Sequence, residues 1–194
     1  MLKRLKTLCF SGIILFFCAS ISPAWAVRAT LMSAKLTLDE PGESPGLFLS
    51  VAYEFDLPEP LKEALHRGIP LYFRYDFFLR KERWYWFNKK KATKSHYLRF
   101  SFDPLTQRYR VSSNGLHQTF DTFEEALPFI KKLYRWRVAP PITLHDNYVA
   151  KVSFQLDTSK LPKPMQVTSG DDEEWRVRSE RNIVQIPSAF TELK

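Results

Sequence analysis

The most concentrated binding chemistry in this sequence is a short stretch in which basic residues surround aromatic ones. Four consecutive aromatic residues, Trp84 to Phe87, are flanked by seven basic residues, with the single acid Glu82 among them. Each cation near an anionic surface contributes ~1 kcal/mol to the free energy of binding to that surface. Aromatic rings suit a lipid interface or stack on a ligand. This stretch is therefore the predicted binding surface, and its candidate residues are Arg80, Lys81, Arg83, Trp84, Trp86, Lys89, Lys90, Lys91 and Lys94.

A purely structural explanation of the same stretch competes with this prediction. Residues two apart in a strand point to the same face of a sheet, so Trp84 and Trp86 would both enter the core. The lysines would then form a hairpin tip that keeps strand edges from aggregating. Both interpretations remain open from the sequence.

Enzymatic motifs are absent from the sequence, which has no glycine-rich phosphate loop, no H-E-x-x-H and no G-x-S-x-G. The four histidines, His66, His96, His117 and His145, are too far apart in sequence to form a metal-ligand pair. Distant residues still converge in some folds. The alternative function is therefore an envelope hydrolase whose site combines His96 or His117 with Glu54, whereas no catalytic residue, metal site or cofactor is predicted from motifs.

Strands are the main elements that must position these residues. Strict alternation of apolar residues predicts strands over 47–55 and 71–79. Weaker patterns, helped by the hairpin signal Asn114-Gly115, add strands over 30–38, 96–102, 108–112, 116–120, 135–138 and 148–156.

Two short helices complete the prediction. One is expected to begin near Pro58, and the other follows Thr122, which forms a capping box with Glu125. The sequence thus predicts a β-rich α+β fold, mainly an antiparallel sheet or β-sandwich of about eight strands with two short helices.

The first 26 residues are typical of a cleaved signal peptide. A basic start precedes an apolar run from Leu8 to Ile21, and Ala24-Trp25-Ala26 supplies small residues at the positions that a signal peptidase reads. The apolar run is shorter than the ~20 residues of a membrane-spanning helix. We therefore expect cleavage after Ala26, a periplasmic location, one β-rich domain over 27–182 and a loosely ordered tail over 183–194.

Removal of the predicted signal peptide changes two properties of the chain. Both cysteines, Cys9 and Cys18, leave with it, so no disulfide and no thiolate metal site is expected. Three basic residues leave as well, which lowers the formal net charge from +8 to +5. An exported protein of modest positive charge favours anionic lipid head groups or envelope polymers over nucleic acid as partners.

Several segments of the sequence resemble one known family. The longest are GIPLYF (68–73), RWYW (83–86), LTQRYRVS (105–112) and LDTSKLPKP (156–164), with the shorter GL (115–116), FDT (120–122) and WRV (136–138) between them. Together they make nearly all of the predicted mature chain similar to a proteobacterial family of exported proteins, domain of unknown function 4390. The resemblance implies no activity, cofactor or catalytic residue. The genes of this family tend to lie beside the gene for a membrane sensor kinase, which implies such a kinase as a partner.

The predicted function is accordingly a non-catalytic periplasmic binding or accessory module. It would present the basic and aromatic stretch, residues 80–94, to an anionic membrane surface or to a membrane sensor protein.

Overall fold

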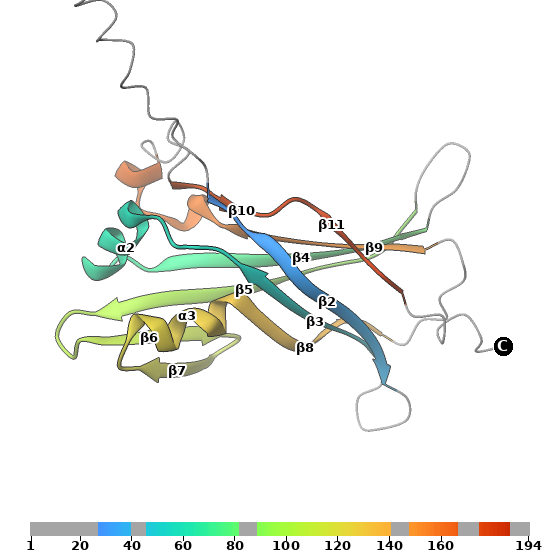
Figure 1. Ribbon diagram of the computed structural model, residues 1–194, viewed down its shortest axis with the longest axis horizontal. Coiled ribbons are helices and arrows are strands. Elements are labelled where there is room, and N and C mark those ends of the chain that lie inside the picture. Colours follow the sequence, from blue (N-terminus) through green and yellow to red (C-terminus); the bar gives the residue numbers. More distant parts are fainter. Residues whose placement is uncertain (1–26, 40–45, 82–88, 141–147, 167–174, 187–194) are drawn as a thin grey trace, which may run out of the picture.

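Most of the chain lies in two antiparallel sheets that face each other (Figure 1). The computed structural model describes residues 27–39, 46–81, 89–140, 148–166 and 175–186. The predicted signal peptide lies outside these ranges, so it remains a prediction. Within them, all eight predicted strands are present as β2 to β9, joined by the short strands β1, β10 and β11. The prediction of a β-rich α+β fold is therefore confirmed.

The smaller sheet has three antiparallel strands in the order β2 (Thr30–Asp39), β3 (Gly46–Glu54) and β8 (Lys132–Ala139). Alternation along β3 buries Leu47, Leu49, Val51 and Tyr53, as the sequence predicts. These side chains form one wall of the core.

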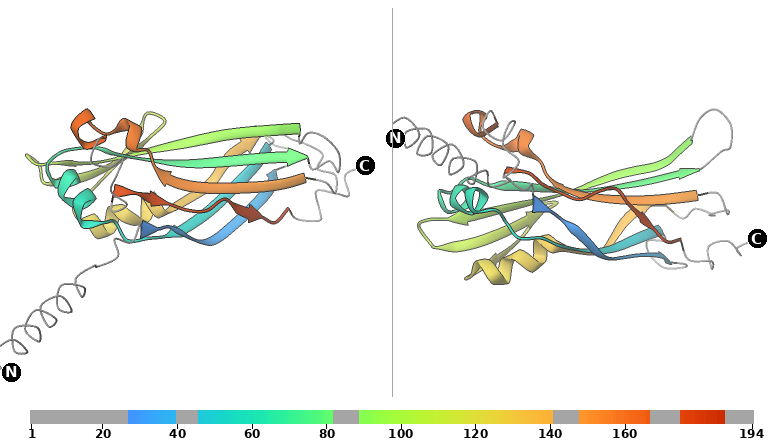
Figure 2. Two further views of the ribbon diagram at one scale, coloured as in Figure 1. Left: turned by 90° about the horizontal axis from the view of Figure 1, so that it is seen from above. Right: turned by 45° about the horizontal axis from the view of Figure 1, so that its top comes forward.

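The larger sheet has eight strands. Its order is β1 (Val27–Arg28), β10 (Val177–Arg178), β9 (Tyr148–Leu156), β4 (Leu71–Lys81), β5 (Lys89–Asp103), β6 (Arg108–Ser113) and β7 (Leu116–Phe120), and β11 (Asn182–Val184) also pairs with β9. All of these pairs are antiparallel except β1 with β10. The long strands β4, β5 and β9 lie side by side along the molecule (Figure 2).

The core between the two sheets is largely aromatic. Alternate residues of β4 point into it and are fully buried: Leu71, Phe73, Tyr75, Phe77 and Leu79. Phe154 of β9 lies at its centre, and its ring centroid is 4.8 Å from that of Tyr75, 5.3 Å from that of Tyr53 and 5.6 Å from that of Phe73. This packing fixes the inner face of β4, and therefore assigns its other residues to the outer face.

Two helices pack against the sheets toward the same end of the sandwich (Figure 1). Helix α2 (Glu59–His66) buries Leu61, Ala64 and Leu65. Helix α3 (Phe123–Lys131) contacts β6 and β7 and begins as predicted, because the Thr122 side chain accepts a hydrogen bond of 3.2 Å from the Glu125 N–H. A 3₁₀ turn (Thr158–Lys160) follows β9. Among the described residues, no helix has both the length and the apolar character needed to cross a membrane.

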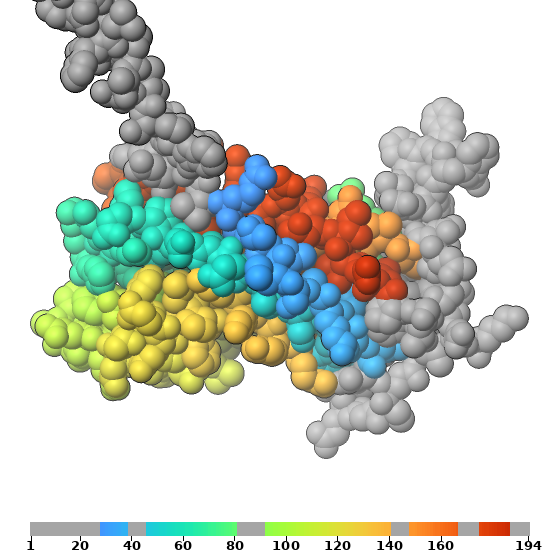
Figure 3. Space-filling model, in the orientation of Figure 1, coloured from blue at the N-terminus to red at the C-terminus, as the bar shows by residue number. Residues whose placement is uncertain are grey.

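The predicted domain boundary at residue 182 falls at the first residue of β11. Ile183 and Val184 pair with β9, and the Val184 side chain is buried. Strand β11 also contacts β2, so the last described strand lies beside the smaller sheet (Figure 3). Alternation over three residues is too short a pattern to predict such a strand.

Candidate functional site

The predicted binding surface begins where β4 ends and resumes where β5 starts. In the register of this ladder, Arg80 pairs with Lys90 and Lys81 pairs with Lys89, while a bulge leaves Lys91 between two pairs. We call these four paired residues the basic ladder end. Two neighbouring rungs of the sheet thus consist only of basic residues, and like charges directly opposite each other destabilise a strand pair.

Strand β9 borders the basic ladder end on its other side. It pairs Val149 with Arg80 and Tyr148 with Lys81. The end of the sheet therefore presents, on three adjacent strands, basic residues beside an apolar and an aromatic residue, and none of these positions holds an acid.

Two members of the predicted surface point to opposite faces of the larger sheet. Lys94 pairs with Phe77, which is fully buried, so Lys94 lies on the inner face. Its Nζ donates a hydrogen bond of 2.7 Å to the carbonyl oxygen of Arg137 on β8. Arg80 lies on the outer face, because it follows the buried Leu79. The structure therefore places Lys94 apart from Arg80 and uses it to join the two sheets.

Several predicted residues lie beyond what the structure describes. Arg83, Trp84 and Trp86 fall outside the described residues, as do the side chains of Lys81, Lys89, Lys90 and Lys91. Whether Trp84 and Trp86 face a ligand or the core therefore remains untested, and both interpretations stay predictions.

The alternative site, built from histidines, is assembled in part. His96 and His117 line one cavity of about 640 Å³, which lies between β5, β6 and β7 on one side and α3 and β8 on the other. His96 Nε2 is 2.9 Å from Ser113 Oγ, at hydrogen-bond distance, and its ring is 5.6 Å from that of Trp136. Burial, and next to it the charge of Lys94, lowers the pKa of His96, so its imidazole is neutral at neutral pH.

Glu54 does not complete this cavity. The carboxylate of Glu54 forms an ion pair with Lys131, and neither residue lines the cavity. The proposed combination of His96 or His117 with Glu54 is therefore not assembled. In the described ranges, no group of three or more histidine, cysteine, aspartate or glutamate residues could hold a metal ion.

Ser113 is the residue of this cavity that the sequence analysis missed. It ends β6 directly before the turn Asn114-Gly115, whose residues have φ angles of 49° and 83°. That hairpin signal indicates where β6 stops, and the alternation with the buried Tyr109 and Val111 puts Ser113 on the inner face. It does not indicate the register of β6 with β5, which pairs Val111 with Phe100 and brings His96 within reach.

The remaining described histidine has a structural role. His66 Nε2 is 2.7 Å from the hydroxyl of Tyr109, and its ring contacts Phe102 edge-on at 5.3 Å. These contacts attach α2 to β5 and β6.

Comparison with known proteins gives one match. No curated protein and no solved structure matches the chain. A family model described as Domain of unknown function (DUF4390) matches residues 28–185. That range begins in β1 and ends directly after β11, so it covers every strand of both sheets. The chain therefore belongs to the DUF4390 family.

Proposed function

We propose that the protein is a non-catalytic binding module of the cell envelope that attaches to an anionic membrane surface through the basic ladder end. The observation that supports this most directly is the pairing of Arg80 with Lys90 and of Lys81 with Lys89. A protein that needs only a stable hairpin gains from opposite charges at such positions and loses stability from like charges. Phosphate groups at the surface of an anionic bilayer would offset that repulsion.

The place of this pairing in the fold supports the same proposal. The basic ladder end consists of the last two residues of β4 and the first two of β5. The pairing of β4 with β5 continues from there into the aromatic core, and its register is interrupted only by the bulge before Arg80. The core therefore holds these cations at one end of a rigid sheet. The predicted signal peptide and periplasmic location, which belong to the same proposal, would bring that end to a membrane.

A membrane sensor protein is the other receptor to consider. Acidic side chains on its outer portion would offset the same repulsion, and the resemblance to the family implies a sensor kinase as a partner. The bilayer is the simpler receptor, because it requires charge only and no complementary shape.

Co-sedimentation with lipid vesicles tests the proposal. The full chain should bind vesicles of phosphatidylglycerol and phosphatidylcholine more tightly than vesicles of phosphatidylcholine alone, and added salt should reduce the difference. The triple variant Lys81→Gln, Lys89→Gln, Lys90→Gln should bind the anionic vesicles about 100-fold more weakly, since each cation contributes ~1 kcal/mol.

A matched control separates position from net charge. The triple variant Lys35→Gln, Lys160→Gln, Lys163→Gln removes the same charge from exposed positions elsewhere. It should bind almost like the wild-type protein. The basic residues Lys3, Arg4 and Lys6 also favour anionic vesicles, so the two triple variants, which both keep residues 1–26, are compared with each other. Equal losses in the two triple variants would contradict the proposal, and so would vesicle binding that added salt does not reduce.

The contact between Ser113 and His96 favours a second candidate function, acyl hydrolysis. Ser113 Oγ would attack an acyl carbon while His96 Nε2 accepts the hydroxyl proton, the division of labour found in serine hydrolases. A fluorophosphonate probe should then label the wild-type protein and leave Ser113→Ala unlabelled. Ser112→Ala is the matched control, because its position in β6 is adjacent and points to the other face. Absence of labelling in the wild-type protein would eliminate this candidate.

A further inference from the structure

The outer face of the larger sheet carries a polar groove that differs from both sites above. The register places Arg74 and Asp76 of β4 beside Gln155 and Ser153 of β9, and Arg178 of β10 pairs with Gln155. These residues, together with Arg181, line a cavity of about 350 Å³. We call this cavity the arginine groove. Its position on the outer face means that the smaller sheet does not cover it.

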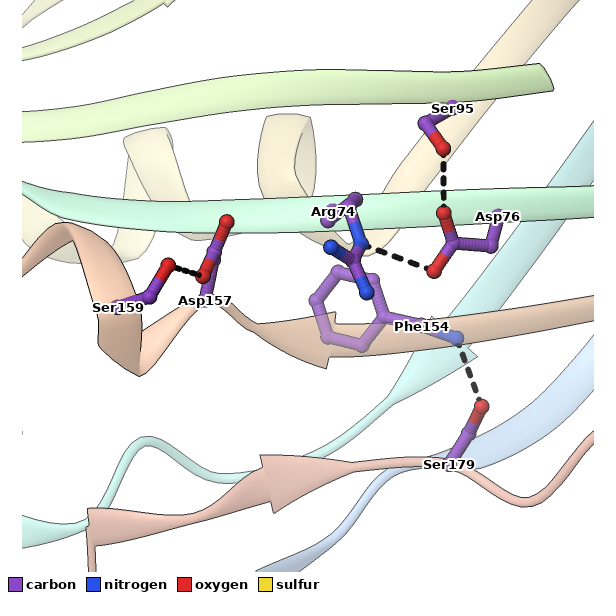
Figure 4. A network of polar contacts seen from close by, with 7 residues as sticks. All are labelled: Arg74, Asp76, Ser95, Phe154, Asp157, Ser159 and Ser179. Atoms are coloured by element: carbon purple, nitrogen blue, oxygen red, sulfur yellow. Dashed lines mark hydrogen bonds and ion pairs between the residues drawn. The ribbon is translucent and has the colours of Figure 1, made fainter. Parts of the chain in front are cut away.

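Arg74 is held in place by neighbours on its own sheet. Its Nε donates a hydrogen bond of 2.9 Å to Asp76 Oδ2, and Asp76 Oδ1 accepts one of 2.6 Å from Ser95 Oγ (Figure 4). When the Gln155 amide is oriented with its oxygen toward Arg74, that oxygen accepts from Arg74 Nη2. Both oxygens of Asp76 are thus occupied within the sheet, and the guanidinium group of Arg74 is oriented before any ligand arrives.

Arg74 also keeps its charge in this setting. Burial by itself lowers the pKa of the guanidinium group, but the hydrogen bond with Tyr97 and the charge of Asp76 raise that pKa above its ordinary value. Arg74 is thus a permanent cation at one wall of the groove.

Among the described residues, no carboxylate forms an ion pair with the other two arginines of the groove. Glu180, which lies between them in sequence, forms an ion pair of 3.1 Å with Arg28 instead. The guanidinium group of Arg181 lies over the ring of Phe78 at 5.0 Å. Within the part of the chain that the structure describes, neither Arg178 nor Arg181 forms an ion pair. Three guanidinium groups and one carboxylate therefore share this groove, which leaves an excess of positive charge.

We propose that the arginine groove binds a phosphate group. Guanidinium groups present paired N–H donors that match phosphate oxygens, and three of them converge here from two strands and the segment after β10. A tetrahedral phosphate offers oxygens in several directions, whereas a carboxylate offers two in one plane. The cavity volume falls within the range of sites for small ligands, roughly 300–1,000 Å³. The phosphate group belongs either to a soluble phosphate ester or to a phospholipid head group.

This inference does not rest on the proposed attachment through the basic ladder end. The groove is built from other residues, and it selects a single phosphate group rather than a charged surface. The two hypotheses can therefore fail separately.

Calorimetric titration of the purified full chain with inorganic phosphate, at constant ionic strength set with sodium chloride, tests the groove. The wild-type protein should bind phosphate, and the double variant Arg178→Gln, Arg181→Gln should bind it at least about tenfold more weakly, because charge-assisted hydrogen bonds are lost. Both side chains are exposed, so the variant should fold normally. The control Arg67→Gln, Arg110→Gln removes the same charge from exposed positions outside the groove and should retain the affinity.

Vesicle binding distinguishes the two sources of phosphate. If the groove variant also loses binding to vesicles of phosphatidylglycerol and phosphatidylcholine, the phosphate belongs to a lipid head group. If it loses inorganic phosphate alone, the ligand is a soluble phosphate ester. The variant Lys81→Gln, Lys89→Gln, Lys90→Gln should keep its phosphate affinity whatever happens to its vesicle binding. No phosphate binding by the wild-type protein, or equal affinity in the wild-type and groove variants, would overturn the inference.

Discussion

Two buried tyrosines that meet in the core should respond in opposite directions when each loses its hydroxyl group. Tyr53 of β3 and Tyr75 of β4 have ring centroids 5.9 Å apart, and both rings are buried. The hydroxyl of Tyr75 donates a hydrogen bond of 2.5 Å to the carbonyl oxygen of Ile130 at the end of α3. The hydroxyl of Tyr53 is buried and forms no well-aligned hydrogen bond with the described residues, although the nearby side chains of Ser179 and Asn182 offset part of the rise in its pKa.

The sizes of the two effects follow from these environments. Tyr75→Phe deletes a buried hydrogen bond and leaves the carbonyl of Ile130 without its partner, so it should lower the free energy of unfolding by about 1–3 kcal/mol. Tyr53→Phe removes a hydroxyl whose desolvation no well-aligned hydrogen bond compensates, and should leave the stability unchanged or raise it by about 1 kcal/mol. Burial raises the pKa of both hydroxyl groups, so both are neutral at neutral pH and neither change removes a charge.

Urea unfolding followed by tryptophan fluorescence measures both variants against the wild-type protein. Each variant is the control for the other, because each loses one oxygen and keeps its ring. The midpoint should fall for Tyr75→Phe and stay or rise for Tyr53→Phe, with equal m-values. Equal losses of stability in the two variants would refute this reading of the core, because they would show that the environments of the two hydroxyls are alike.

Three further predictions concern groups described above. Asp76→Asn should lower the free energy of unfolding by about 1–3 kcal/mol, measured by thermal unfolding, because the half-buried Arg74 loses its counter-charge. Asp121→Asn, which breaks the exposed ion pair with Arg108, should lower it by less than about 1 kcal/mol. The pKa of His96 is lowered in the folded protein, so the unfolded chain binds the proton more readily and the free energy of unfolding should fall as the pH drops below 6.5. In urea titrations at successive pH values, His96→Gln should make this dependence on pH less steep. Phe154→Ala should cost about 3–5 kcal/mol in the same assay, and an equal cost for the partly exposed Phe129→Ala would contradict the central role of Phe154.

Local sequence patterns account for the elements but not for their partners. Alternation from Leu71 to Leu79 predicts which side chains of β4 enter the core, and the Asn114-Gly115 turn predicts the pairing of β6 with β7. The pairing of β4 with β9, and the grouping of β8 with β3, join segments that are far apart in sequence. Alternation gives a strand its two faces, but both edges of a strand can pair with any other strand, so packing decides the partner.

The same distinction explains the outcome for the candidate site. Composition alone indicates the basic residues from Arg80 onward, and their cross-strand pairing requires the register of β4 with β5. The inward position of Lys94 follows from that register and is not visible in the composition. The arginine groove depends on Arg178 and Arg181, about 100 residues from Arg74, and no local pattern connects them. The sequence therefore reveals charged residues that are close together along the chain, but not those that are distant in sequence and brought together by strand pairing.

The parallel pairing of β1 with β10 has a consequence for the order of folding. Val27 pairs with Val177 and Arg28 with Arg178, so the two strands at this edge of the larger sheet come from opposite ends of the described chain. Bringing these strands together closes a loop of about 150 residues, which costs conformational entropy. Only the few backbone hydrogen bonds between two such short strands offset this cost. This edge should therefore form last, after β9 has already paired with β4. Until then the free edge of β9 is open to strands of other chains, and the docking of β10 and β11 on β9 ends that exposure.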